Sequence, residues 1–140
     1  GVTAIKYLTF AYCSSLKTIE IPAGVTSIEN QVFAGCTTLV SINIPEGVTS
    51  IEEYTFHSCY SLPSIDIPAS VTFIRNYAFY MCNNLKTVYC QAVEPPVLED
   101  AFGNFTATLY VPVGSKEKYQ QAEVWKNFET IEEMDFSIND

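Results

Sequence analysis

The sequence predicts a repeat solenoid of the α/β class with a 23-residue period, built mostly from short parallel strands and short helical turns. Three observations support this fold. Written in rows of 23, the first 92 residues align without a gap. Six columns hold the same residue in all four rows, and each row repeats one order of strand, turn and helical patterns. Because one row cannot bury its own apolar face, equivalent rows must stack on one another.

Strand signals occur at two places in each row. In the second row, Ile42 and Ile44 alternate with polar residues, which is the period of a half-buried strand. Pro45 and Gly47 then favour a turn, and a second, shorter extended segment ends at Ile51. We expect like strands of successive rows to pair in parallel at about 4.8 Å.

The rest of each row carries a different spacing. In the third row Phe56, Cys59 and Leu62 recur at every third residue, which predicts a helical or 3₁₀ turn with one buried stripe. All three belong to the invariant columns. In the second row these columns hold Val25, Thr26, Ile28, Phe33, Cys36 and Leu39.

The repeat loses its regularity after residue 92. Phe102 keeps the Phe column, Phe105 takes the Cys column, and residues 109–112 resemble the strand of earlier rows two positions early. We therefore assign residues 1–112 to the solenoid, with four regular rows and a degenerate fifth. Residues 113–140 are assigned to a C-terminal cap and tail.

The C-terminal segment has the features of a cap. Ser115 is expected to cap a short helix that continues to about Ala122. Trp125, Phe128 and Ile131 follow as apolar residues that can cover the end of a stack. Solenoids need such terminal caps because their last turn would otherwise expose its core.

The other end of the chain begins within the repeat pattern, at Gly1. We expect the first row to expose apolar residues such as Ile5 and Phe10, together with unpaired backbone groups. An uncovered parallel edge is a template for further strand pairing. The expected outcomes are fraying of residues 1–12 or end-to-end self-association.

Composition and charge exclude several classes of function. The net charge of −9, from 16 acidic and 7 basic residues, argues against nucleic-acid binding. One His and no catalytic or metal-binding motif predict a protein that is not an enzyme and holds no cofactor and no metal. No apolar run approaches the roughly 18 residues of a membrane span. No signal-peptide pattern occurs in the sequence.

The cysteines and the single histidine have simple structural interpretations. All five Cys residues occupy columns that we expect to face inward, so we predict reduced, slowly reacting thiols. One thiol per turn in a straight ladder cannot surround a zinc ion. Disulfides between successive turns are conceivable from their spacing, but parallel side chains disfavour the required geometry. His57 lies in a variable column, which indicates an outward position.

Two polar columns on the strand side form the first candidate binding surface. Such a ladder is the usual ligand surface of a solenoid, although any solvent-facing strand shows the same pattern. The first column contains Glu20, Asn43, Asp66 and Tyr89. The second column contains Thr18, Ser41, Ser64 and Thr87.

A second candidate surface consists of tyrosines. Most Tyr residues occupy variable columns, and Tyr54 and Tyr77 share one column, so we expect them to lie side by side on adjacent turns. Exposed Tyr gives a large contact area at low entropic cost, as binding surfaces require. The alternative is that these rings only cover neighbouring apolar surface.

The repeat GVTSIxxxxFxxCxxLxSIxIP resembles the leucine-rich repeats of BspA-like cell-surface proteins of anaerobic oral and gut bacteria. The segment LYVPVGSKEKYQQAEVWKNFETIEE also resembles their closing module. This resemblance implies a right-handed leucine-rich-repeat superhelix, a cell-surface or secreted location, and adhesion or protein binding. Ser70 and Gln91 in the fourth row depart from the repeat, which fits a transition into the cap.

We therefore expect a non-catalytic protein-binding or adhesion module whose ligand is a host or extracellular-matrix protein. Two alternatives remain open at this point. One is a structural spacer that presents another domain. The other is a carbohydrate-binding module, for which the pair Tyr54 and Tyr77 is the support.

Overall fold

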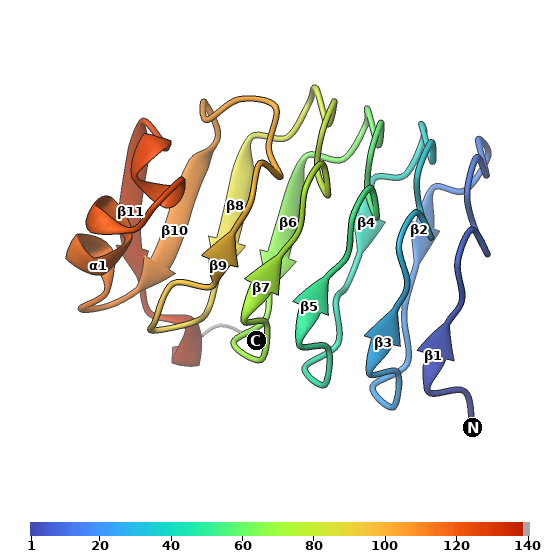
Figure 1. The fold of residues 1–140 in the computed structure, drawn as a ribbon, viewed down its shortest axis with the longest axis horizontal. Coiled ribbons are helices and arrows are strands. Elements are labelled where there is room, and N and C mark those ends of the chain that lie inside the picture. The colour runs from blue at the N-terminus through green and yellow to red at the C-terminus, as the bar shows by residue number, and fades with distance from the viewer. Residues whose placement is uncertain (139–140) are drawn as a thin grey trace.

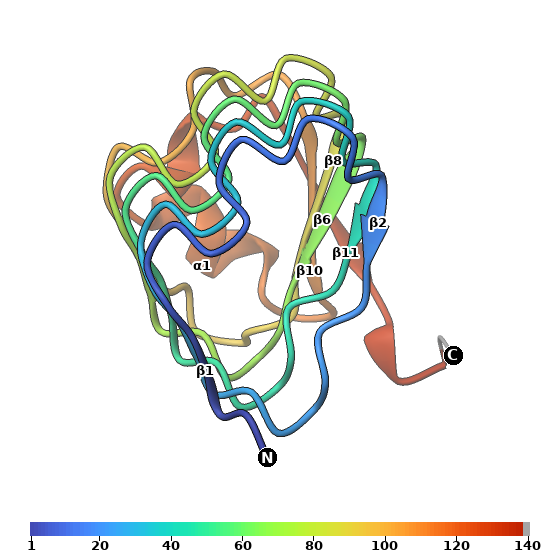
Figure 2. The ribbon, with the colours of Figure 1, turned by 90° about the vertical axis from the view of Figure 1, so that its right-hand side faces the viewer.

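A computed structural model describes residues 1–138 and forms a β-solenoid of about six turns. The turns stack along one axis from the N-terminus to the C-terminal helix (Figure 1). One side, which we call the long-strand face because the four- and five-residue strands all lie on it, is opposite a side of two-residue strands, the short-strand face (Figure 2). A third side, the turn face, connects them.

The two sets of strands alternate along the chain. The long-strand face contains β2 (Thr18–Ile19), β4 (Ser41–Ile42), β6 (Ser64–Ile67), β8 (Thr87–Cys90), β10 (Thr108–Pro112) and β11 (Thr130–Met134). The short-strand face contains β1 (Ala4–Ile5), β3 (Ser27–Ile28), β5 (Ser50–Ile51), β7 (Phe73–Ile74) and β9 (Val97–Leu98). All ladders are parallel, and in the regular rows the paired residues are 23 apart, as in Ile65 with Val88 and Ile51 with Ile74. The predicted strands and period are confirmed.

The predicted helical or 3₁₀ turn with a buried stripe is confirmed only in part, because no continuous helix forms there, and the α/β class is confirmed mainly in its strands. On the turn face, Cys59 and Leu62 each donate a backbone hydrogen bond three residues back, but Phe56 donates to Ala78 of the next turn. Tyr54 and Ser58 adopt positive φ angles of 61° and 63°. These left-handed residues turn peptide groups toward the neighbouring turn, which interrupts a continuous helix.

The invariant Phe and Cys columns form the centre of the core. Rings of the Phe column stack from Phe10 to Phe102 with centroids 5.0–5.6 Å apart and nearly parallel planes. The thiol of Cys59 donates to the carbonyl of Phe33 at 3.3 Å, and Cys82 donates to Phe56 at 3.2 Å. Each thiol therefore links two turns. All five cysteines are free, and all except the half-buried Cys13 are buried, as predicted.

The C-terminal segment covers the end of the core. The short helix α1 (Lys116–Gln121) and the 3₁₀ helix η1 (Trp125–Asn127) close the outline that Figure 2 shows end-on. Tyr119 and Trp125 are fully buried, and they donate hydrogen bonds to the carbonyls of Ala92 at 2.6 Å and Pro96 at 2.8 Å. The apolar closure predicted from Trp125 and Phe128 is confirmed.

The helix cap differs from the prediction. The Ser115 side chain makes no capping hydrogen bond, and its buried hydroxyl finds no partner within residues 1–138. Instead, the carboxylate of Glu133 accepts from the backbone N–H of Lys116 at 3.1 Å. Glu133 belongs to β11, a strand that the sequence did not predict because only Ile131 of its five residues is buried. β11 pairs with β10 over five positions and so adds a sixth turn.

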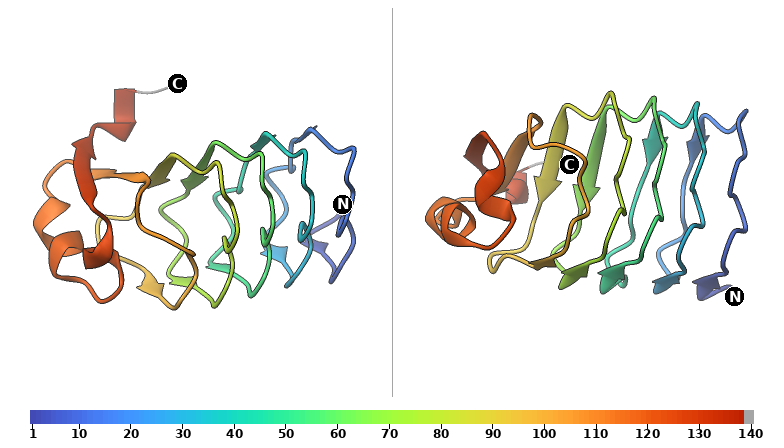
Figure 3. Two further views of the ribbon diagram at one scale, coloured as in Figure 1. Left: turned by 90° about the horizontal axis from the view of Figure 1, so that it is seen from above. Right: turned by 45° about the horizontal axis from the view of Figure 1, so that its top comes forward.

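After β11 the chain leaves the stack on the long-strand side, in the 3₁₀ helix η2 (Phe136–Ile138), as Figure 3 shows. Residues 139 and 140 of the predicted tail lie outside the described residues. At the opposite end, Ile5, Phe10 and Leu16 are only half-buried, whereas their equivalents Phe33 and Leu39 are fully buried. The first row is therefore more exposed than the others, as expected.

The Phe column predicts a large effect of one core substitution. Phe56 stacks between Phe33 and Phe79 and is 1% exposed. We expect Phe56→Ala to leave a cavity and to lower the free energy of unfolding by roughly 3–5 kcal/mol in denaturant titrations. Tyr60→Ala, at an exposed position of the same turn, should cost far less. Equal losses in the two variants would contradict the role of the column.

The buried thiols predict a loss of stability at alkaline pH. Burial raises the pKa of Cys36 and Cys90 to about 11 and that of Cys82 to about 12, whereas an unfolded thiol ionises near about 8.5. Because the thiols ionise less readily in the folded state than in the unfolded state, the stability is unaffected by their ionisation below about pH 8.5. As the pH rises from there towards the folded pKa values, ionisation of the unfolded thiols lowers the free energy of unfolding. Urea unfolding should therefore give a midpoint that is constant near neutrality and falls above about pH 8.5.

Replacing one of these thiols provides the control. Cys82→Ala should be less stable at neutral pH, because it removes a buried contact, but its stability should decline less steeply at high pH. A midpoint that does not change between neutral and strongly alkaline pH would contradict the prediction.

Candidate functional site

The described part of the chain contains no cluster of metal-binding side chains. Within residues 1–138, no group of three or more His, Cys, Asp or Glu side chains could hold a metal ion. His57 is partly buried between aromatic rings, its Nδ1 lies 2.9 Å from the Ser58 hydroxyl, and burial lowers the pKa of its imidazole. Among residues 1–138, the helices are too short and too polar to cross a membrane.

The long-strand face brings the predicted polar columns into register. Ser64 pairs with Thr87, and the column continues through Thr108 to Thr130. At the other end of the face, a hollow of about 390 Å³ brings Thr18, Glu20, Ser41 and Asn43 together. The predicted residues therefore lie on one face, in two groups.

Asn43 differs from its neighbours because its amide is already used. The side-chain oxygen accepts from the backbone N–H of Ile21 at 2.7 Å, and the side-chain nitrogen donates to the carbonyl of Ile21 at 2.9 Å. This pair of hydrogen bonds joins two turns where the short strands β2 and β4 have ended. Asn43 therefore links the backbones of two turns, and few of its hydrogen-bonding groups remain for a ligand.

The first column, which contains Asp66 and Tyr89, ends in an aromatic pair between acidic residues. Asp66, Tyr89, Tyr110 and Glu132 occupy successive positions across four paired strands. The rings of Tyr89 and Tyr110 stack with centroids 5.5 Å apart, and the rings of Tyr89 and Phe136 are arranged edge to face with centroids 6.4 Å apart. Tyr110 was missed because it lies in the degenerate fifth row, and Glu132 was missed because β11 was not predicted.

Both carboxylates of this column have polar neighbours. Asp66 accepts a hydrogen bond from the side-chain amide of Gln91 at 2.7 Å. Glu132 lies 4.0 Å from the ammonium group of Lys116, and both of these side chains are about half exposed. Such an exposed ion pair contributes little to stability, so Glu132 remains accessible to a partner.

Tyr54 and Tyr77 lie side by side, as predicted, but within a larger cluster. Their ring centroids are 5.2 Å apart and their planes are inclined by 31°. His57 and Tyr80 complete a group of four rings on the turn face, with Tyr77 and Tyr80 arranged edge to face at 5.0 Å. Because the rings contact one another, much of their surface is used within the cluster.

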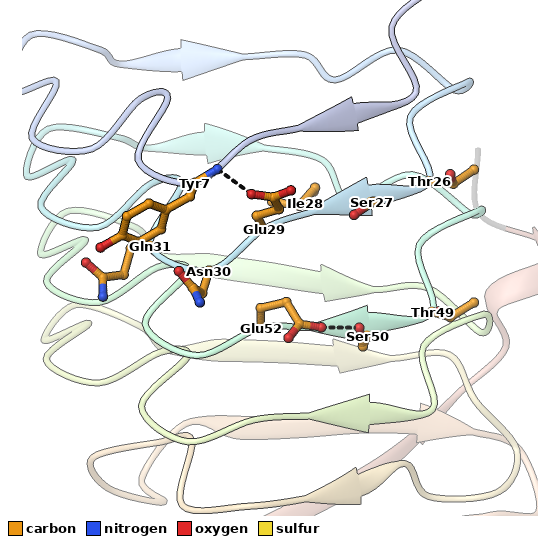
Figure 4. A pocket seen from close by; sticks show the side chains of 10 residues that line it. All are labelled: Tyr7, Thr26, Ser27, Ile28, Glu29, Asn30, Gln31, Thr49, Ser50 and Glu52. Carbon is orange, nitrogen blue, oxygen red and sulfur yellow. Dashed lines mark hydrogen bonds between the residues drawn. The ribbon is translucent and has the colours of Figure 1, made fainter.

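Another hollow lies at the edge of the short-strand face and was not predicted. It measures about 610 Å³ and is formed by three successive turns (Figure 4). Its lining includes Tyr7, Glu29, Asn30, Gln31 and Glu52. One feature of the sequence could have indicated this hollow: a single column contains Lys6, Glu29, Glu52 and Arg75, so basic and acidic side chains can pair between turns there.

Comparison with known proteins supports the fold independently. The family described as BspA type leucine rich repeat region matches residues 3–137 in six copies. A leucine rich repeat protein of T. pallidum has a similar structure, with a TM-score of 0.72 and 26% identity over 94% of this chain. A leucine rich cell surface protein of Faecalibacterium prausnitzii has a TM-score of 0.66 and 27% identity over 95% of the chain.

Both solved structures are longer than this sequence. The chain covers 62% of the T. pallidum protein and 30% of the F. prausnitzii protein. Among curated proteins, no relative matches the chain.

The hydrogen bonds of Asn43 predict a structural effect. Asn43→Ala leaves the backbone N–H and carbonyl of the buried Ile21 without their partner, so we expect a loss of about 1–3 kcal/mol in unfolding free energy. Ser41→Ala, two residues earlier and exposed, should change it by less than about 0.5 kcal/mol. Hydrogen exchange at Ile21 should accelerate only in Asn43→Ala. Unchanged protection of Ile21 would refute this role.

Proposed function

The chain belongs to the BspA-type leucine-rich-repeat family, and we propose that it acts as a non-catalytic protein-binding or adhesion module at the bacterial cell surface. A cell-surface protein among its structural relatives supports the location. The division of the chain at residue 112 and end-to-end self-association remain predictions.

The observation that carries this proposal is the column Asp66–Tyr89–Tyr110–Glu132. Tyrosine is enriched at protein interfaces because it contributes a large, rigid contact area together with a polar group. Here two Tyr rings are held in a stack by a parallel ladder, so little entropy is lost when a partner binds them. The solvent-facing neighbours on the ladder are hydroxyl groups, which suit the polar rim of an interface.

Charge indicates the kind of partner. The outward positions of β6, β8, β10 and β11 include the acids Asp66 and Glu132 and contain no Lys or Arg. A protein surface with basic residues would complement this face and would be steered towards it over a distance set by the salt concentration. We therefore expect a host or extracellular-matrix protein with an exposed basic region as the ligand.

The two alternatives make different demands on the surface. A structural spacer needs polar columns but no aromatic group on its surface, so the Tyr89–Tyr110 stack favours the binding module over the spacer. A carbohydrate module that relies on Tyr54 and Tyr77 needs an open ring face, and these rings are inclined and shared within the cluster on the turn face.

Binding to purified extracellular-matrix proteins tests this function. We expect saturable binding of at least one of them in a surface-based assay, weakened at least tenfold (about 1.4 kcal/mol) by Tyr89→Ala/Tyr110→Ala. The matched control is Tyr54→Ala/Tyr77→Ala, which removes a similar aromatic pair from the turn face. Affinity should also fall as salt is raised, and circular dichroism confirms that both variants are folded.

Other outcomes would redirect or overturn the proposal. A loss of binding in the Tyr54/Tyr77 variant alone would transfer the binding site to the turn face. If none of the extracellular-matrix proteins shows saturable binding, the structural spacer is favoured.

A further inference from the structure

We propose that the hollow on the short-strand face is a binding site for a neutral oligosaccharide. The hollow lies between the strands β3 and β5 and the turn that carries Tyr7 (Figure 4). It lies on a different face from Tyr89 and Tyr110, so the proposal does not depend on the protein-binding function.

The charged groups of the hollow are already paired. Glu29 accepts a hydrogen bond from the backbone N–H of Tyr7 at 2.8 Å, and its other oxygen lies 3.5 Å from the ammonium group of Lys6. Glu52 lies 3.2 Å from Nε of Arg75 and also accepts from the Ser50 hydroxyl. A charged ligand would have to compete with these internal partners. The arrangement therefore favours a ligand without net charge.

The remaining lining offers neutral groups that are free to bind. The side chains of Ser27, Asn30, Gln31 and Thr49 make no hydrogen bond to another residue within 1–138. Side-chain amides and hydroxyls can each both donate and accept. Sugar hydroxyls have the same double capacity, so neighbouring hydroxyls of one sugar can pair with several of these groups at once.

Tyr7 supplies an aromatic surface at the rim of the hollow. Its side chain is 52% exposed, and Figure 4 shows it extending beside Gln31. The C–H groups of a pyranose ring can stack on such a face while its hydroxyls bind the polar lining. By contrast, the buried centre of a protein interface is mainly apolar, and Ile28 is the single aliphatic residue that lines this hollow.

The repeat geometry extends the site beyond one sugar. Gln31 shares its column with Tyr54 and Tyr77, at intervals of 23 residues. These side chains therefore follow one another at about 4.8 Å along the solenoid axis. A chain that leaves the hollow past Gln31 meets Tyr54, which is 36% exposed. This path favours an oligosaccharide over a single sugar.

Titration with defined tetrasaccharides tests the proposal. The probes are cellotetraose, mannotetraose and chitotetraose, with a hyaluronan tetrasaccharide as the acidic comparison. Binding is followed by ¹H–¹⁵N NMR on the full chain. We expect saturable binding of at least one neutral tetrasaccharide with a Kd below about 10 mM. Backbone shifts should be concentrated at Tyr7, Asn30 and Gln31.

Substitutions at Tyr7 separate stacking from hydrogen bonding. We expect Tyr7→Ala to weaken binding at least tenfold, and Tyr7→Phe, which keeps the ring, to remain within about threefold of the unaltered chain. Tyr12→Ala is the matched control, because Tyr12 lies in the same turn, is 71% exposed and does not line the hollow. Asn30→Ala, which keeps every charged pair intact, should weaken binding without changing stability.

Four results would overturn the proposal. They are no saturable binding of any neutral tetrasaccharide, binding of the acidic tetrasaccharide alone, unchanged affinity in Tyr7→Ala, and shifts located at Tyr89 and Tyr110 instead of the hollow. If oligosaccharide binding fails while protein binding is retained, the proposed protein-binding function still stands. If protein binding fails while oligosaccharide binding is retained, only the protein-binding function is rejected.

Discussion

Each turn of this protein is completed by hydrogen bonds to the next turn at a fixed offset. On the turn face, Phe33, Phe56 and Phe79 donate their backbone N–H groups to carbonyls of the following turn at 2.8–3.0 Å. On the strand faces, parallel ladders impose the same spacing. A backbone group that is buried without a partner is costly, so every turn must keep the register of its neighbours. The 23-residue period of the sequence follows from this requirement.

Register explains both the uniform core and the varied surface. An inward column places identical side chains in contact, which is why the Phe rings stack and the thiols of Cys36, Cys59 and Cys82 each reach the carbonyl of a Phe one turn earlier. An outward column also places its members side by side, but it leaves their identity free. Pairs such as Lys6 with Glu29 and Arg75 with Glu52 therefore form between turns, and the same rule creates the stack of Tyr89 on Tyr110.

The end of the stack requires a different solution. A last turn has no neighbour to cover its core, and here aromatic residues fill that role. Trp125 and Phe128 pack against Phe102, and Tyr119 packs against Trp125. Tyr119 and Trp125 also donate to carbonyls near the last regular row, so the cap satisfies backbone groups as well as apolar surface. Glu133 contributes by capping α1 from the final strand.

The sequence by itself determined the period, the inward columns, the parallel pairing and the adjacency of Tyr54 and Tyr77, because register follows directly from residue spacing. Only the tertiary structure decided four other features. They are the left-handed residues that replace a helical turn, the strand β11, the use of Asn43 to join backbones, and the hollow beside Tyr7. Periodicity identifies which side chains lie in one column. It does not determine whether an outward side chain turns to its own backbone, to a neighbouring turn or to solvent, because these arrangements differ by only a few hydrogen bonds.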